Sequence, residues 1–288
     1  MKISYVNGKF VNHNEASIHP EDRGHLFADG VYEVIAFENG VLLDGTQHMA
    51  RLKQSLAGIR IAEPASMEEI KKTIYEVIAR NNRVEGFVYL QITRGTATRT
   101  HTFPKNTAPN MFIYILEAKK PADELYQNGV KIISAEETRW KYRNYKTISL
   151  LPNILAKQQA YENSAFEAWF VEENGVVTEG SSTNAFIVKN GTVITHPADR
   201  NILGGITRET LLSLARQNGI KVEEKPFTLE EALTADEAFL SATSSWALPV
   251  VEVDGKKIGN GQVGEITKTL QKLYKDYVIK VTSKTAAA

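Results

Sequence analysis

The chain has 288 residues, and its 34 basic and 34 acidic side chains leave no formal net charge. This length exceeds the commonest domain size, so two domains are expected. The balanced charge offers no overall field to hold a nucleic-acid backbone or an anionic membrane. The chain contains no cysteine, which excludes a disulfide framework, a thiolate nucleophile and a zinc-thiolate site.

The first part of the chain predicts strands, then helices, then strands again. Alternating apolar and polar residues surround Asn7-Gly8 and Asn39-Gly40, two dipeptides typical of hairpin turns. A helix is expected over residues 46–59, and a second helix begins at Ser66, where the spacing to Glu69 is that of a capping box. The segments FVYLQITRG and NMFIYILEA then indicate buried strands.

The polar, proline-containing stretch EAKKPADELYQ, residues 117–127, marks the expected domain boundary. It predicts a smaller N-terminal domain over residues 1–120 and a larger C-terminal domain over residues 121–288. Strand-like segments return beyond it, with helices expected near LPNILAKQQAYEN and ITRETLLSLARQNG. This order predicts an α+β (mixed α/β) fold with two domains. The start MKISYVNGKF has no apolar run of signal-peptide length and no segment reaches bilayer length, so a cytoplasmic location is expected.

The segment TRWKYRNYKTISLL, residues 138–151, contains a lysine in an unusual setting. If this segment is extended, Lys146 lies on the face of Trp140 and Tyr142 rather than with the arginines, and it leads into apolar ISLL. Partial desolvation is then expected to lower the pKa of Lys146. A neutral amine can attack a carbonyl and form a Schiff base. Spacing alone leaves a solvated lysine as the alternative, and the interleaved arginines and aromatics also suit a single-strand binder, which the neutral charge disfavours.

Seven separated segments resemble the fold-type IV family of pyridoxal-phosphate enzymes, and most closely its D-amino-acid aminotransferases. They span nearly the whole chain in the order of that family. In this sequence they read EDRGHLFADGVYEV, QHMARL, TRGTATRTHTFP, RNYKTISLLPNILAKQ, VTEGSSTNAF, ILGGITRE and the residues near Thr243. The resemblance implies a two-domain architecture with the cofactor, pyridoxal 5'-phosphate, between the domains.

The resemblance also implies roles for individual residues toward that cofactor. Lys146 is the Schiff-base residue, which also moves a proton at the substrate's alpha carbon. Glu179 faces the pyridine nitrogen and keeps it protonated. Gly204-Gly205 opens a helix whose first N–H groups, at Ile206 and Thr207, suit a phosphate. The other implied cofactor contacts are Arg51 and Thr243 on the phosphate, Leu203 on the ring face and Ser182 in a supporting hydrogen-bond network. Without the resemblance, each of these residues has an ordinary surface, turn or core interpretation.

The resemblance also implies that three residues bind the substrate's alpha-carboxylate: Arg99, His101 and Tyr32. In the family the arginine and the histidine reach the neighbouring subunit's site, so the resemblance implies a homodimer. An idle surface loop is the alternative for Arg99 and His101. His48 shares a helical face with Arg51, and its simpler interpretation is a surface histidine. No metal site is expected, because the histidines lack a ligand spacing such as HExxH.

Together these features predict a cytoplasmic, homodimeric aminotransferase with no nucleic-acid or membrane partner. It would move the amino group of D-amino acids, D-alanine among them, to 2-oxoglutarate or pyruvate by a ping-pong mechanism. The preference for D-amino acids comes only from the resemblance at Arg99 and His101, because composition and periodicity carry no handedness. Three alternatives stay open: a branched-chain L-amino-acid or amine aminotransferase, an aminodeoxychorismate lyase, and a non-catalytic protein that binds pyridoxal phosphate.

Overall fold

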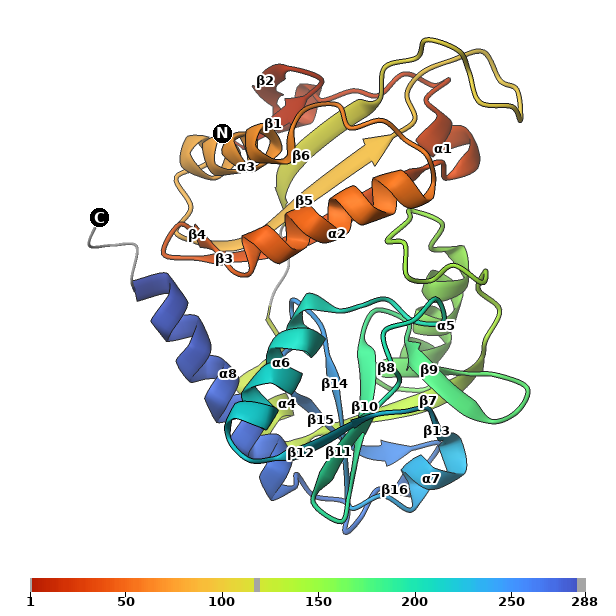
Figure 1. Ribbon diagram of the computed structural model, residues 1–288, viewed down its shortest axis with the longest axis vertical. Helices are drawn as coiled ribbons and strands as arrows, with labels where there is room; N and C mark the ends of the chain where they lie inside the picture. The colour runs from red at the N-terminus through yellow and green to blue at the C-terminus, as the bar shows by residue number, and fades with distance from the viewer. Residues whose placement is uncertain (1, 117–119, 284–288) are drawn as a thin grey trace. The chain divides into compact units, whose positions relative to one another are not determined.

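The computed structural model describes residues 2–116 and 120–283, which form two compact units, each built on one β-sheet (Figure 1). Of these residues, 2–116, 145–149 and 280–283 form the first unit, and 120–144 and 150–279 form the second. Helices together with one antiparallel and one mixed sheet confirm the predicted α+β class. Within the described ranges, no helix is long and apolar enough to cross a membrane.

The sheet of the first unit is antiparallel, and helices cover one of its faces (Figure 1). Its strands are, in spatial order, β2 (Lys9–Asn12), β1 (Ile3–Val6), β6 (Asn110–Leu116), β5 (Glu85–Thr93), β3 (Gly30–Glu38) and β4 (Val41–Leu42). The helices of this unit are the 3-10 turn η1 (His13–Glu15), α1 (Arg23–Phe27), α2 (Gly45–Gly58) and α3 (Met67–Arg80).

Local sequence signals place these elements where they were predicted. Asn7 and Gly8 have φ values of +46° and +89°, and Asn39 and Gly40 have +52° and +73°, the left-handed conformation that tight hairpin turns require. At the start of α3, Ser66 and Glu69 form the reciprocal bonds of a capping box. The predicted hairpins and the predicted start of α3 are therefore confirmed.

Alternation along the strands separates the two faces of the first sheet. Met111, Ile113 and Ile115 of β6 are buried in the core with α2 and α3. The intervening Phe112 and Tyr114 lie on the opposite face, where their rings meet Tyr89 of β5. The same alternation applies to β3, which pairs with β5 in this sheet. The side chains of the adjacent residues Tyr32 and Glu33 therefore lie on opposite faces.

The second unit is built on a mixed sheet (Figure 1). Its strands are, in spatial order, β12 (Lys221–Glu224), β11 (Thr192–Thr195), β10 (Asn184–Lys189), β14 (Glu237–Ser241), β15 (Leu248–Val253), β7 (Val130–Glu136), β8 (Glu167–Val171), β9 (Val176–Gly180) and β13 (Phe227–Thr228), and β16 (Lys256–Lys257) pairs with β15. The helices are α4 (Asp123–Asn128), α5 (Leu151–Glu162), α6 (Ile206–Gln217), α7 (Leu229–Leu233) and α8 (Glu265–Ser283), of which residues 280–283 are assigned to the first unit.

Most elements of the second unit agree with the prediction. Pro152 lies in the first turn of α5, and α6 ends just before Gly219, whose φ is +75°. Part of the stretch expected to be a polar bridge is instead helical, as α4, while its residues 117–119 lie outside the described residues.

Residues Tyr145–Ser149 return to the first unit, although the boundary predicted at residue 120 assigns them to the second domain. Thr147 forms a β-bridge with Val31, and the Tyr32 N–H donates to the Lys146 carbonyl at 3.0 Å. This edge of β3 is open because β4 pairs only with the far end of β3. A strand with an unpaired edge accepts an added segment through its backbone groups, which fixes Lys146 to the first sheet.

Candidate active site

The main chain around Lys146 is held between β3 and α2. The Lys146 N–H donates to the hydroxyl of Ser55 at 3.0 Å, and Ser55 is fully buried on α2. Next to it, the Tyr145 ring packs so closely on Gly58 that a Cβ at position 58 would lie 2.3 Å from the ring. A glycine is therefore needed on α2 for the segment to lie where it does. These contacts restrict the backbone that carries the Lys146 side chain.

The side chain of Lys146 lies beside Tyr32, one of the residues predicted to bind the substrate carboxylate. The Lys146 Nζ is 4.2 Å from the centroid of the Tyr32 ring. The ring of Tyr32 in turn stacks on Tyr89, with centroids 5.7 Å apart. The structure thus brings the predicted Schiff-base lysine and a predicted substrate residue together on the aromatic face of the first sheet.

A buried ionic cluster occupies the opposite face of β3. The fully buried carboxylate of Glu33 accepts from Nε and Nη2 of Arg51, both at 2.8 Å, and lies 2.8 Å from Nδ1 of His48. Burial acts to raise the pKa of Glu33, but the charge and hydrogen bonds of Arg51 outweigh it and lower the pKa to about 2. Burial lowers the pKa of His48, so a neutral ring donates its Nδ1 proton to the carboxylate.

The cluster corrects one expectation and adds a residue that sequence reasoning missed. His48 is 2% exposed, so its expected surface position is wrong; α2 turns it toward the buried carboxylate because His48 and Arg51 share one helical face. Glu33 was not anticipated. It fixes the Nε–Nη2 edge of Arg51, while the contact of Arg51 with a phosphate stays a prediction.

We expect Glu33→Gln to destabilise the protein by about 3 kcal/mol at neutral pH, because the amide replaces the negative charge that the buried Arg51 guanidinium contacts. The contribution of Glu33 is present above its unfolded pKa, near 4.5, and is lost as the pH falls through its folded pKa of about 2. Urea denaturation of both proteins should therefore show a difference in unfolding free energy that narrows over this acid range.

The matched control is Glu76→Gln, which removes an exposed carboxylate that pairs with Arg80 at 2.6 Å on α3. An exposed pair of this kind contributes about 0.5 kcal/mol. Equal losses from Glu33→Gln and Glu76→Gln would contradict the role assigned to the buried cluster.

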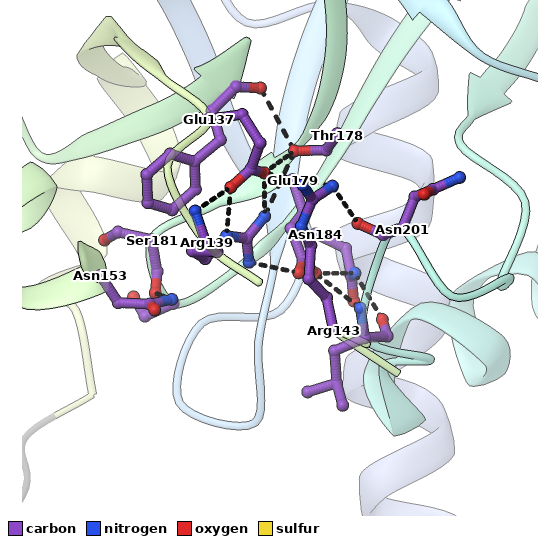
Figure 2. A network of polar contacts seen from close by, with 12 residues as sticks. Glu137, Arg139, Arg143, Asn153, Thr178, Glu179, Ser181, Asn184 and Asn201 are labelled. Atoms are coloured by element: carbon purple, nitrogen blue, oxygen red, sulfur yellow. Dashed lines mark hydrogen bonds and ion pairs between the residues drawn. The ribbon is translucent and has the colours of Figure 1, made fainter. Parts of the chain in front are cut away.

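The second unit holds Glu179 in a fixed orientation at the end of β9 (Figure 2). Its Oε1 accepts from Nη1 of Arg139 at 2.6 Å, and its Oε2 accepts from Asn184 Nδ2 and from the Leu203 N–H, both at 3.1 Å. Burial raises the pKa of Glu179 even though Arg139 opposes it. A cationic group at this carboxylate would favour its ionised form, which is the property expected of a partner for a protonated pyridine nitrogen.

Arg139 is shared by two carboxylates in this cluster (Figure 2). Besides Glu179, it donates from Nη2 to Oε2 of Glu137 at 2.6 Å, and Thr178 donates to the same Glu137 oxygen at 2.8 Å. Arg143 lies beside them, with Nη1 2.9 Å from Glu172 and 3.5 Å from Glu137. The structure therefore assigns both arginines to a buried ionic network.

This network overturns the expectation of an extended segment over residues 139–146. Residues 143–145 form a turn and a bend, so strict alternation of side chains does not hold. The physical reason is that Arg139 turns inward to the buried carboxylates of Glu137 and Glu179, and Arg143 to Glu137 and the partly exposed Glu172. Trp140 and Tyr142 instead pack on each other and stay 44% and 51% exposed. Ion pairs removed from water fix the positions of their charged groups, and they therefore decide the conformation of a segment that pairs with no strand.

The start of α6 provides donors suited to an anion. Gly205 is the N-cap and no side chain caps the helix, so the first N–H groups, from Ile206 onward, point out of the helix start. A Cβ at position 205 would lie 2.0 Å from Oδ1 of Asn184. Asn184 thereby links the helix start to Glu179, and Gly205 is the residue that allows this approach.

Strand register gathers the remaining predicted cofactor residues of the second unit at the same end of the sheet. Asn184, the first residue of β10, pairs with Ser241, the last residue of β14. Thr243 follows in the turn closed by the bond from the Ser245 N–H to the Ala242 carbonyl at 3.1 Å. Glu179, Leu203, Ile206, Thr207 and Thr243 thus belong to one end of this sheet.

This end of the sheet fits a phosphate group. The hydroxyl of Ser241 is buried and has no hydrogen-bond partner among the residues that the structure describes, although a buried unpaired hydroxyl costs about 1 to 3 kcal/mol. At Gly204, an added Cβ would meet only Ala198 Cβ, at 3.8 Å. An unsatisfied donor and open space beside an uncapped helix start are properties that a bound anion would use.

Ser182 belongs to a hydrogen-bond network, with Glu167 as its centre. The fully buried Glu167 accepts from the hydroxyl of Ser182 at 2.8 Å and from the hydroxyl of Ser181. The Ser181 carbonyl in turn accepts from Asn153 Nδ2 at 2.7 Å (Figure 2). Glu167 was not anticipated from the sequence, and the approach of Ser182 to a cofactor stays a prediction.

Arg99 and His101 lie on an exposed loop of the first unit. The Arg99 guanidinium carbon is 5.0 Å from the centroid of the Phe27 ring, and the His101 ring centroid is 5.5 Å from it. The described residues show no hydrogen bond or ring contact between Tyr32 and either of them, so the structure brings Arg99 and His101 together but not onto Tyr32 of the same chain.

Comparison with known proteins identifies the family. Residues 30–253 match the model of amino-transferase class IV, and the chain belongs to that family. It is 41% identical over 285 residues to the D-alanine aminotransferase of Bacillus licheniformis, which covers 99% of this chain and 100% of that protein. The D-alanine aminotransferase of Staphylococcus haemolyticus is 37% identical over 95% of this chain and 97% of its own length.

The fold is shared with solved members of the same group. The crystal structure of the branched-chain aminotransferase of the thermophilic archaeon Thermoproteus uzoniensis with norvaline matches with a TM-score of 0.86 at 28% identity, over 97% of this chain and 95% of that one. The branched-chain amino acid aminotransferase of Escherichia coli matches with a TM-score of 0.88 at 26% identity, over 94% of this chain and 92% of that one. The family that the sequence motifs predicted is therefore confirmed.

Proposed function

We propose that this chain is a pyridoxal-phosphate-dependent aminotransferase that transfers the amino group of D-amino acids, with D-alanine as a donor, to an α-keto acid. The geometry that carries the proposal is the buried Glu179 carboxylate, which Arg139, Asn184 and the Leu203 backbone orient. The similarity to D-alanine aminotransferases over almost the whole chain supports the donor. The proposal includes the cytoplasmic location that the sequence predicts.

Each residue of the site has its own proposed role. Lys146 holds the cofactor covalently, and its Nζ carries a proton to and from the substrate's alpha carbon. Glu179 stabilises a proton on the ring nitrogen, while the start of α6, with Ile206 and Thr207, and Arg51 receive the phosphate. When bound, pyridoxal phosphate supplies the aldehyde that takes up the amino group and a ring that withdraws electrons from the alpha carbon. Leu203, Ser182 and Thr243 complete the proposed cofactor contacts.

The substrate carboxylate is assigned to Tyr32, Arg99 and His101. Two cationic or hydrogen-bonding side chains and a phenol provide the donors that a carboxylate accepts. Arg99 and His101 lie together on an exposed loop, which supports the proposal that they serve the site of a second copy of the chain.

An exposed apolar stripe on α5 supports a homodimer. One side of α5 packs Ala156 and Ala160 against β8, while Leu151, Ile154 and Leu155 on the other side are 66%, 60% and 62% exposed. Contiguous exposed apolar side chains on a soluble protein mark an interaction surface. We propose that a second copy of the chain covers the α5 stripe, Leu151, Ile154 and Leu155.

We expect Leu155→Lys to convert the dimer into a monomer at micromolar concentration, because dimer formation would then bury an unpaired charge. Sedimentation velocity measures the change. The control is Val84→Lys, which alters an isolated apolar residue that is 70% exposed. If Leu155→Lys dimerises as tightly as Val84→Lys, the α5 stripe does not form the interface.

A chiral donor assay tests the proposed function. Purified protein with pyridoxal phosphate and 2-oxoglutarate is offered D-alanine or L-leucine, and the keto acid produced from each donor is measured. We expect consumption of D-alanine alone. Consumption of L-leucine alone would make the chain a branched-chain L-aminotransferase. Pyruvate release from aminodeoxychorismate without a keto-acid acceptor would make it a lyase, and cofactor binding without turnover of any amine would make it non-catalytic.

A further inference from the structure

The loop that carries Arg99 and His101 connects β5 to β6 without regular secondary structure. No hydrogen bond or ion pair from another described residue reaches the Arg99 guanidinium or the His101 ring. Flexible side chains on such a loop lose conformational entropy when they bind a ligand, which weakens binding unless the free protein already holds them in place. The contacts that hold this loop against α1 therefore affect how tightly Arg99 and His101 can bind a ligand.

Arg23, the first residue of α1, holds the backbone of the loop. It is 3% exposed, and its Nη1 donates to the carbonyl of Thr100 at 2.7 Å and lies 3.4 Å from the carbonyl of Thr102. Thr100 is the residue between Arg99 and His101. One buried guanidinium thus binds the carbonyl groups of the two residues that flank His101.

Arg23 is itself oriented by a carboxylate. Its Nε donates to Oδ2 of Asp29 at 2.8 Å, and Asp29 also accepts from Nε and Nη2 of Arg94 at 2.8 and 2.9 Å. Burial acts to raise the pKa of Asp29, but Arg94 and Arg23 outweigh it, so the pKa lies below its usual range. The guanidinium carbon of Arg94, the first residue of the loop, lies 3.6 Å from the ring centroid of Phe103, two residues after His101. The two arginines that contact the loop around His101 are therefore both bound to one carboxylate.

Phe27, the last residue of α1, provides the surface on which the two side chains rest. The guanidinium carbons of Arg99 and Arg23 lie 5.0 and 4.8 Å from the Phe27 ring centroid, and the His101 ring is tilted against it at 5.5 Å. Cation–π and edge contacts of this kind restrict rotamers without consuming hydrogen-bond donors. The Arg99 and His101 donors thus stay available for a ligand.

We propose that α1 is a positioning element for the carboxylate-binding loop, with Arg23 fixing the backbone at Thr100 and Phe27 holding the side chains of Arg99 and His101. The inference rests on the proposed function, which assigns Arg99 and His101 to the substrate carboxylate. Arg23 and Phe27 do not contact the substrate. They act by lowering the entropy that Arg99 and His101 lose on binding.

The test is a mutant cycle on the dimeric, cofactor-loaded enzyme. Phe27→Leu keeps an apolar side chain and removes the aromatic face. We expect it to weaken binding of propionate, measured by isothermal titration calorimetry, and to raise the KM for D-alanine, each by about three- to fivefold, the effect of losing one exposed cation–π contact. The kcat should stay within about twofold, because the reacting groups are unchanged.

The same substitution is then made in an Arg99→Ala/His101→Ala background, where Phe27→Leu should have no further effect on propionate affinity. Coupling of this kind reports an action through the missing side chains, which general loss of structure would not produce. The matched control is Phe10→Leu, since the Arg80 guanidinium carbon lies 4.1 Å from the Phe10 ring centroid in the same unit. It should leave propionate affinity unchanged.

A second variant, Arg23→Lys, keeps the charge but cannot serve Asp29 and Thr100 together, and we expect it to weaken propionate binding by about tenfold. Three outcomes are separable. Coupled losses support the inference. Losses that are absent, or equal in both backgrounds, overturn it while leaving the carboxylate site in place. Unchanged propionate affinity in Arg99→Ala/His101→Ala overturns the proposed carboxylate site and the inference together.

Discussion

The transaminase activity of Lys146→Ala should be lower than that of the wild type by a factor of about 10⁴ or more. The change removes both the covalent attachment of the cofactor and the base that moves a proton at the alpha carbon. Lys146→Arg should lose as much. Its guanidinium can still lie over the Tyr32 ring, but it is permanently protonated and cannot act as an amine nucleophile.

Peptide mapping after borohydride reduction provides a measurement independent of turnover. In the wild-type holoenzyme the reduced cofactor should be attached to a peptide containing Lys146, and Lys146→Ala should retain no attached cofactor. The control is Lys141→Ala, because Lys141 is an exposed lysine of the same segment. A label on any other lysine, or undiminished activity in Lys146→Ala, would remove Lys146 from the centre of the mechanism.

The structure accounts for why Lys146 differs from its basic neighbours, although not by the route that the sequence suggested. Alternation in an extended segment predicted that Lys146 points away from the arginines. The separation is instead made by the turn at residues 143–145. Arg139 and Arg143 pair with carboxylates of the second unit, while Tyr145–Ser149 adds to the open edge of β3.

Features that short-range physics determines were predictable from the sequence. The hairpins at Asn7-Gly8 and Asn39-Gly40 and the capping box of α3 depend on residues within four positions of one another. The family was also predictable, because seven separated segments occur in the order of known enzymes. Such segments point to site residues without showing their contacts.

Long-range pairs were not predictable, because their partners come from distant parts of the chain. Glu33 lies on β3 among the buried Val31 and Ile35, and its partners His48 and Arg51 lie on α2. One signal was nevertheless available. An acidic residue on the apolar face of a strand requires a buried cation, and α2 presents Arg51 on the face that also carries the buried Leu52 and Ser55.

Glu179→Gln should reduce kcat by about 10² to 10³-fold, the range found when one pre-oriented electrostatic partner is removed. The amide can still occupy the position between Arg139 and Asn184, but it carries no charge to stabilise a proton on the ring nitrogen. The fold should survive, because Arg139 keeps its ion pair with Glu137 at 2.6 Å.

Cofactor affinity provides a second measurement that separates charge from packing. Burial raises the pKa of Glu179, so the ionised fraction falls as the pH decreases through that raised pKa. The affinity of the apoenzyme for pyridoxal phosphate should fall with it. The affinity of Glu179→Gln should lack the part of the pH dependence that comes from the Glu179 carboxylate, and it should keep only the part that both proteins share. Fluorescence titration of each apoenzyme over a pH series measures the difference.

The matched control is Glu137→Gln, which removes a second buried carboxylate bound to Arg139. Glu137 is bonded to Arg139 and Thr178 rather than to the Leu203 backbone and Asn184. The same chemical change there should alter kcat far less. Equal losses in both variants would mean that the arginine network as a whole, and not the Glu179 carboxylate, supplies the effect, and the assignment of Glu179 to the ring nitrogen would then be wrong.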